Sequence, residues 1–175
     1  WFIKQKGLVP KNLFDVEELK NILIDFNPES KESGNYYNAI LQNLFFATLN
    51  KEINDRAFAK EKDNRREVKT LYRYQEMFIE KKEENILKLF HKVPFLNGGL
   101  FECLDKTIGM DGVEYAYDGF SRNAIKSSNG NFKHRAFLPN ELFFHAEKGI
   151  IPLLKKYNFT VEENSSDEIQ VALDP

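Results

Sequence analysis

The sequence has little of several features that define protein classes. Its single cysteine, Cys103, excludes an internal disulfide framework and a cysteine metal cluster, and it agrees with a reducing cytoplasm. No apolar run approaches the roughly 20 residues of a membrane span, and no signal peptide is visible, so we expect no membrane partner. A net charge of only −2 excludes a general electrostatic attraction to nucleic acid, and any such binding needs a local basic patch.

Aromatic residues are plentiful, with 16 Phe and 7 Tyr, and they predict an aromatic-rich core or interface. The length of 175 residues suits one domain. The chain begins with Trp1 and ends with Asp174-Pro175, a pair that is typical of a helix start. We therefore expect residues 1–175 to form a single helical domain that is an internal fragment of a larger protein.

Apolar residues recur at helical spacing in four segments, so the predicted fold class is mainly α. The first of these helices has Asp15 as its cap, and Glu18 three residues later suits a capping box. The second, "YYNAILQNLFFATLN", is apolar over most of its girth and is predicted to be central. The predicted helices cover 15–26, 35–49, 81–91 and 148–157, with Pro152 in the first turn of the last one.

Three other segments depart from this pattern. Residues 51–70 are dense in charges of both signs, which indicates a solvated helix or a mobile loop. Around 106–134, closely spaced Gly, Asn and Asp residues predict a small irregular or β-hairpin insertion in the helical domain. Residues 162–175 hold acidic and no basic residues, and we expect an exposed acidic tail that leads to the next domain.

The stretch "KVPFLNGGLFECLD" contains the turn Asn97-Gly98-Gly99. A phosphate-binding P-loop needs Lys followed by Ser or Thr after its last glycine, and a dinucleotide loop needs G-x-G-x-x-G; neither pattern is present. We interpret the turn as structural. One of its glycines would adopt a positive φ, so that Phe95, Leu100 and Phe101 turn inward.

No catalytic constellation emerges from the sequence. The three histidines are far apart and lack metal-ligand spacing: His91, His134 and His145. Glu67-x-Lys69 has the spacing of a magnesium-dependent nuclease, with Asp55 or Asp63 as an upstream acid, but its charged neighbours favour a solvated surface segment. We therefore predict no catalytic, cofactor-binding or metal-binding residue in this fragment.

Two basic sets are candidates for contact with DNA phosphates. In the first, basic residues that could share one side of a helix alternate with Tyr72 and Tyr74. Its members are Arg65, Arg66, Lys69 and Arg73. The second lies in the Gly- and Asn-rich region and comprises Arg122, Lys126, Lys133 and Arg135. Ordinary charged surface, balanced locally by acidic residues, is the alternative for both sets.

Several stretches occur in an order that is similar to a known family. They are "ILQNLFFATLN", "TLYRYQEMF", "KVPFLNGGLFECLD", "FLPNELFF" and "KKYNFTVEEN…EIQVALDP". Together they resemble the connector region just upstream of the methyltransferase domain in fused type II restriction–modification enzymes, the type IIG-like proteins with an N-6 adenine DNA methyltransferase. The resemblance covers about residues 10–175, and "PFLNGGLFE" and "YNFTVEEN" are its most specific parts.

The resemblance implies a role for the fragment within a larger enzyme. The connector would position the nuclease and methyltransferase domains, and it could contact the backbone of double-stranded DNA. The parent would be a site-specific adenine methyltransferase with or without endonuclease activity, and it would use S-adenosylmethionine and, for cleavage, magnesium. The Asn-Pro-Pro-Tyr motif that holds a flipped adenine is absent here, since "NPES" at 27–30 lacks the second Pro and the aromatic. The alternative is a protein-interaction scaffold with no DNA contact.

Overall fold

The computed structural model describes residues 1–60, 67–96, 98–104, 106–116, 120, 125–126, 132–133, 137–163 and 169–174. The fold is mainly helical, as the sequence predicts. The helical elements are α1 (Phe2–Gln5), η1 (Lys11–Phe14), α2 (Val16–Ile22), η2 (Tyr36–Leu41), η3 (Asn43–Thr48), η4 (Ile53–Asp55), η5 (Gln75–Met77), α3 (Glu83–Phe90), η6 (Gly98–Phe101), α4 (Asn140–Phe144) and α5 (Ile150–Leu154). The strands are β1 (Lys106–Ile108), β2 (Glu114–Ala116), β3 (Ile125–Lys126), β4 (Phe132–Lys133), β5 (Asn158–Glu163) and β6 (Ile169–Asp174).

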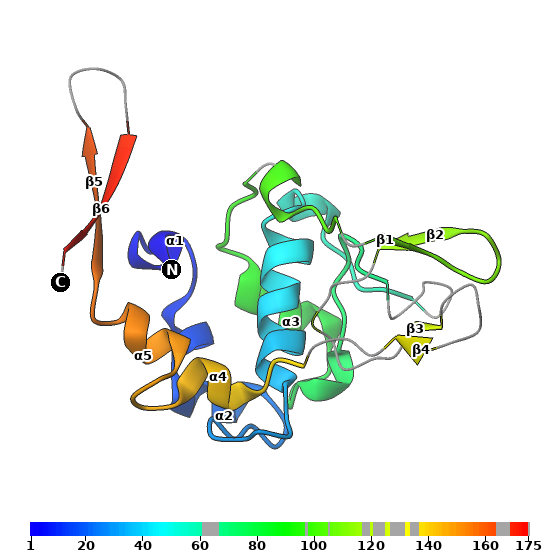
Figure 1. The fold of residues 1–175 in the computed structure, drawn as a ribbon, viewed down its shortest axis with the longest axis horizontal. Coiled ribbons are helices and arrows are strands. Elements are labelled where there is room, and N and C mark those ends of the chain that lie inside the picture. The colour runs from blue at the N-terminus through cyan, green and yellow to red at the C-terminus, as the bar shows by residue number, and fades with distance from the viewer. Residues whose placement is uncertain are drawn as a thin grey trace.

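The helical rod made of η2 and η3 is the centre of the molecule, and it is the cyan coil in Figure 1. The rod is wound as a π-helix, because its backbone N–H groups bond five residues back: Leu49 N donates to Leu44 O at 2.9 Å. Most of its residues are buried on all sides, including Tyr36, Ile40 and Ala47. The prediction of a central helix over 35–49 is therefore confirmed.

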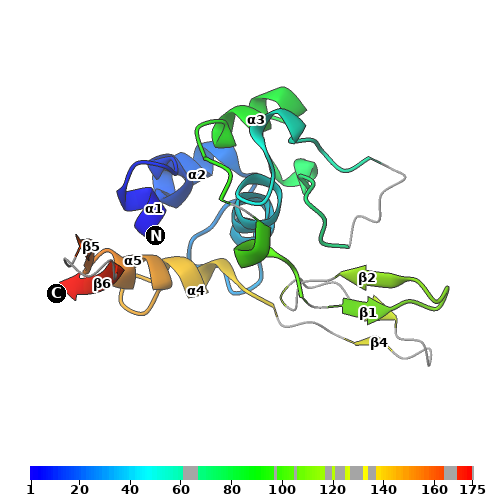
Figure 2. The same ribbon diagram turned by 90° about the horizontal axis from the view of Figure 1, so that it is seen from above.

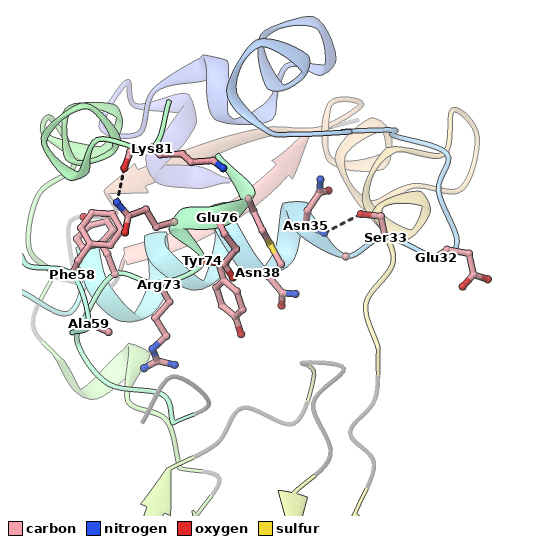
Figure 3. Close-up of a pocket in the computed structure, with 14 residues that line it drawn as sticks. Glu32, Ser33, Asn35, Asn38, Phe58, Ala59, Arg73, Tyr74, Glu76 and Lys81 are labelled. Atoms are coloured by element: carbon pink, nitrogen blue, oxygen red, sulfur yellow. Dashed lines mark hydrogen bonds between the residues drawn. The ribbon is translucent and has the colours of Figure 1, made fainter. Parts of the chain in front are cut away.

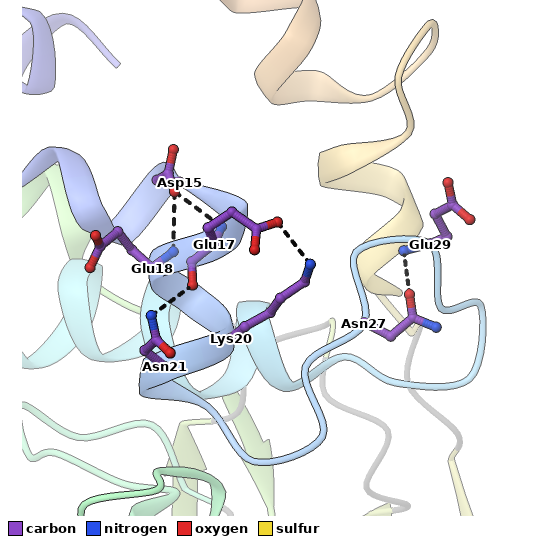
Figure 4. Close-up of polar contacts among 7 residues, drawn as sticks. All are labelled: Asp15, Glu17, Glu18, Lys20, Asn21, Asn27 and Glu29. Atoms are coloured by element: carbon purple, nitrogen blue, oxygen red, sulfur yellow. Dashed lines mark hydrogen bonds and ion pairs between the residues drawn. The ribbon is translucent and has the colours of Figure 1, made fainter.

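Helix α2 begins as predicted but ends early. Asp15 Oδ1 accepts hydrogen bonds from the backbone N–H groups of Glu17 and Glu18 at 3.0 and 3.1 Å, which is an N-cap (Figure 4). The predicted helix runs to residue 26, whereas α2 stops at Ile22. The reason is tertiary, since Leu23 forms an antiparallel bridge with Phe78, and the backbone there must be extended.

Helix α4 is tied to the start of the central rod by a buried amide. Asn140 Nδ2 donates to Asn35 Oδ1 at 2.8 Å, and Asn140 Oδ1 accepts from Tyr36 N at 3.2 Å. The Tyr36 and Phe144 rings pack edge to face with centroids 4.6 Å apart. Helix α5 follows with Pro152 in its first turn, as predicted, because a proline there removes no helical hydrogen bond.

The strands form three separate two-stranded antiparallel ribbons. β1–β2 and β3–β4 lie at one end of the molecule and β5–β6 at the opposite end, where it extends away from the helices (Figures 1 and 2). Within the expected acidic tail over 162–175, the described residues belong to β5 and β6, which pair from Asn158↔Asp174 to Glu163↔Ile169. Asp174 is the last residue of β6, and the helix start at Asp174-Pro175 stays a prediction because Pro175 lies outside the described residues.

Candidate functional site

The segment that contains Lys69 and Arg73 crosses the central rod in an extended or bent conformation. The sequence predicts a shared helical face for the first basic set; this is wrong for residues 67–74, none of which are helical. Tyr72 exchanges backbone hydrogen bonds of 2.9 Å with the neighbouring strand-like segment, to Ala57 O and from Ala59 N. Because these bonds keep the backbone of the segment extended, a helix cannot form there. Arg65 and Arg66 lie outside the described residues.

Arg73 is not the open surface residue that the sequence suggests, because only 8% of it is exposed. Its peptide group is bound by Asn43 of the central rod, whose Oδ1 accepts from Arg73 N at 2.9 Å and whose Nδ2 donates to Arg73 O at 2.9 Å. Arg73 Nη2 donates to Lys69 O at 3.3 Å. The guanidinium is thus a positioned group in the wall of a pocket.

Lys69 forms an ion pair with Glu67, with Nζ 3.3 Å from Oε2. The two residues of the nuclease-like spacing are therefore paired with each other. Asp55 is exposed, and Asp63 lies outside the described residues. In the part of the chain that the structure describes, no three His, Cys, Asp or Glu side chains gather closely enough to hold a metal ion.

The second basic set is only partly described. Lys126 lies on β3 opposite Phe132, and Lys133 lies on β4 opposite Ile125. Arg122 and Arg135 lie outside the described residues.

A pocket of about 740 Å³ opens beside Arg73 (Figure 3). Its lining joins residues from before the rod, from the rod and from three segments after it: Glu32, Ser33, Gly34, Asn35, Asn38, Phe58, Ala59, Tyr72, Arg73, Tyr74, Gln75, Glu76, Met77 and Lys81. Figure 3 shows the side chains of Arg73, Tyr74 and Asn38 directed to the same side of the rod. A guanidinium, an aromatic ring and an amide together suit a planar polar group or a phosphate ester.

The backbone of Tyr74, which lines the pocket, is strained. Its φ is 59° and its ψ 34°, in the left-handed region that a tyrosine rarely adopts. Such a conformation costs on the order of 1–3 kcal/mol and persists where the surroundings enforce it. Its neighbours on both sides enforce this conformation. Before Tyr74, Asn43 binds the backbone N–H and C=O of Arg73, and after it the short helix η5 starts at Gln75.

A buried polar contact joins Tyr72, which lines the pocket, to the central rod. Thr48 Oγ1 and the Tyr72 hydroxyl are 2.6 Å apart. Burial raises the pKa of Tyr72 to about 12, while the hydrogen bond with Thr48 and the charge of Arg56 act in the opposite direction. The hydroxyl therefore stays protonated near neutrality, and it serves as a structural contact rather than as a base.

The Arg56 guanidinium joins the C-terminal ends of two helices. It donates to Thr48 O at 3.0 Å, to Phe90 O at 3.1 Å and to Val93 O at 2.8 Å. Burial lowers the pKa of Arg56, and the negative ends of the two helix dipoles favour its charge. Sequence reasoning missed both Arg56 and Asn43, since neither role has a local pattern.

The Asn97-Gly98-Gly99 turn is structural, but not in the predicted way. η6 begins at Gly98, and Gly99 has no positive φ. The segment instead docks on the end of the rod: Leu96 N donates to Leu49 O at 2.9 Å, and the Phe101 ring stacks on Phe45 with centroids 5.7 Å apart. Asn97 itself lies outside the described residues.

The described histidines have structural surroundings. His91 follows the last residue of α3, and His145 Nδ1 accepts hydrogen bonds from Glu147 N at 3.2 Å and Lys148 N at 3.3 Å. His134 lies outside the described residues. Cys103 is half-buried.

The chain matches no family model, no curated protein and no solved structure. Within the described ranges, no helix has both the length and the apolar character to cross a membrane.

Proposed function

We propose that the chain is the helical connector that precedes the N-6 adenine methyltransferase domain of a fused type II restriction–modification enzyme, with residues 106–134 as a small insertion. One observation supports this proposal above others: three of the stretches that carry the family resemblance contact one another although they are far apart in the sequence. Asn43 of "ILQNLFFATLN" binds the peptide of Arg73 in "TLYRYQEMF". Phe45 of the first stretch stacks on Phe101 of "KVPFLNGGLFECLD".

These three stretches thus pack as one unit, as a rigid spacer between two catalytic domains requires. The parent enzyme would act in the cytoplasm on double-stranded DNA with S-adenosylmethionine, and with magnesium where it cleaves. The connector itself would hold the two flanking domains in register, and it would contribute no catalytic group.

The connector also contacts the DNA backbone in this proposal. Lys69, together with Arg65 and Arg66, supplies the phosphate contacts, and the buried Arg73 orders the segment that carries them. Such contacts position a protein on a duplex and carry no sequence information. Recognition of the target sequence would then belong to other domains of the parent.

Charge reversal in this basic set tests the proposal. Fluorescence anisotropy with a labelled duplex of arbitrary sequence at low salt should give a Kd in the range of roughly 10⁻⁴ to 10⁻⁶ M that weakens steeply as salt rises. The triple variant R65E/R66E/K69E should abolish binding, while K31E, at an exposed position outside the basic set, should reduce it only slightly. Absence of duplex binding by the unmodified chain would contradict backbone contact.

A second candidate function, a protein-interaction scaffold without DNA contact, is favoured by the β5–β6 ribbon. In the register, the apolar residues Phe159 and Val161 pair with Leu173 and Val171. A two-stranded ribbon is at best marginally stable by itself in water, so a neighbouring domain that covers the ribbon would stabilise it. The same duplex titration separates the candidates, because a scaffold would not bind DNA at any salt concentration.

A further inference from the structure

Three lysines from distant parts of the chain converge on a second pocket. Lys4 lies in α1, Lys11 starts η1, and Lys155 follows α5. The contact that brings these segments together is the hydrogen bond from Gln5 Nε2 to Tyr157 O at 3.2 Å. The pocket has a volume of about 530 Å³ and is lined by Lys4, Lys11, Asn12, Phe14, Asp15, Glu18 and Lys155.

Lys4 is held in place over aromatic rings. Its Nζ lies 3.6 Å from the centroid of the Trp1 ring and 5.7 Å from that of Phe14, both within the range of a cation–π contact. Burial lowers the pKa of Lys4, and the positive charges of Lys155 and Lys11 lower it further. Like charges therefore face one another here, which is unfavourable unless an anion joins them.

The described carboxylates do not neutralise these lysines directly. No carboxylate of the described residues forms an ion pair with Lys4, Lys11 or Lys155. Asp15 lines the pocket, but its Oδ1 already accepts two backbone N–H groups at the start of α2 (Figure 4). Glu18 remains as the one other acidic residue of the lining, so the three lysines leave an excess of positive charge.

Asn12 lines the pocket beside the three lysines. Its Oδ1 is buried and has no hydrogen-bond partner among the described residues. A buried acceptor without a donor is costly, and a native fold normally satisfies it with protein, water or ligand. Because this oxygen is shielded from solvent, the lysines supply the attraction for a ligand in the pocket.

We propose that Lys4, Lys11 and Lys155 bind a phosphate group in this pocket, which Asn12 also lines. Monohydrogen phosphate, phosphomonoesters and the nucleic-acid backbone all carry the negative oxygens that three lysines would bind. The site lies apart from Lys69 and Arg73, and it stands whether or not the connector role does.

NMR titration with inorganic phosphate tests the site. Phosphate should shift the side-chain amide signals of Asn12 and the Cε signals of the lysines. The double variant K11E/K155E should weaken phosphate binding by about tenfold or more, because each charged hydrogen bond is lost. The matched control is K148E/K156E, which makes the same change of charge at two exposed positions that do not line the pocket. Circular dichroism should show that both variants stay folded, since Lys11 and Lys155 are exposed.

Two outcomes would overturn the proposal: no phosphate-dependent shift at Asn12, or equal weakening in K11E/K155E and K148E/K156E. A second arm identifies the source of the phosphate. If a short duplex displaces inorganic phosphate, and K11E/K155E weakens the duplex as well, the ligand is a nucleic-acid backbone. If the duplex leaves the Asn12 shift unchanged, it is free phosphate or a phosphomonoester. If R65E/R66E/K69E loses duplex binding but keeps the phosphate-dependent shift of the Asn12 signals, the result bears on the connector role alone.

Discussion

The side chain of Asn43 binds the peptide group of Arg73 with two hydrogen bonds, both 2.9 Å long, in the way that one β-strand binds the next. The two residues are 30 positions apart in the sequence, and both are buried. The Asn43 amide also donates to Ala39 O within the rod at 2.8 Å. One side chain thus joins the central rod to the segment that carries the candidate site.

Replacing Asn43 tests how much this contact stabilises the fold. We expect Asn43→Ala to lower the free energy of unfolding by about 2–4 kcal/mol, because a buried N–H and a buried C=O of Arg73 lose their partner. Urea denaturation measures the change. Asn21→Ala, at an exposed position of α2, is the control and should change stability by less than about 0.5 kcal/mol. Equal stability of the two variants would contradict the assigned role of Asn43.

The Arg56 guanidinium provides a second test, through a substitution that keeps the charge. A lysine has a single ammonium and cannot reach the carbonyls of Thr48, Phe90 and Val93 together. We expect Arg56→Lys to destabilise by roughly 2–4 kcal/mol, since carbonyls at the ends of two helices lose their donors. Thermal unfolding checks this, with Lys51→Arg as the converse control. A melting temperature of Arg56→Lys equal to that of the unmodified chain would show that the donors are replaceable.

The raised pKa of Tyr72 predicts how the free energy of unfolding depends on pH. Its pKa is about 12 in the folded chain, against an ordinary value of about 10 when unfolded. Between these values the unfolded chain releases the proton and the folded chain keeps it, so stability should fall as pH rises from about 10 to 12. The contribution is fully present below about pH 10, and its loss amounts to roughly 2–3 kcal/mol.

The difference between the unmodified chain and Tyr72→Phe isolates this contribution. At neutral pH the variant should be less stable by about 1 kcal/mol, because the hydrogen bond with Thr48 is lost. The gap between the two proteins should narrow or reverse above pH 10, measured by denaturant titration at each pH. Burial also raises the pKa of Tyr36, and this effect is common to both proteins and cancels. A constant gap across this range would show that Tyr72 titrates normally.

Glycine substitutions test the corrected view of the 97–99 turn. A Cβ at Gly99 would meet open space, so Gly99→Ala should change stability by less than about 0.5 kcal/mol. At Gly149, a Cβ would lie 2.6 Å from both His145 N and His145 O. Backbone atoms cannot yield easily, so Gly149→Ala should destabilise by about 1–3 kcal/mol. Urea denaturation of the two variants measures both changes. A large loss of stability in Gly99→Ala would support the predicted backbone strain at the turn.

The sequence by itself determined the helical class and the centre of the fold. "YYNAILQNLFFATLN" is apolar on nearly all sides, and only a buried position suits such a helix. Asp15 predicted the start of α2 because an N-cap acts within its own turn. Both predictions depend on local physical chemistry, which the order of residues expresses directly.

Tertiary structure decided the ends of elements and the positions of charged side chains. α2 stops at Ile22 since Leu23 pairs with Phe78, and Arg73 is buried because Asn43 binds its peptide. The convergence of Lys4, Lys11 and Lys155 likewise depends on how α1 packs against the end of α5. Contacts between residues that are far apart in sequence arise only when the chain closes on its core, so no local pattern could reveal them.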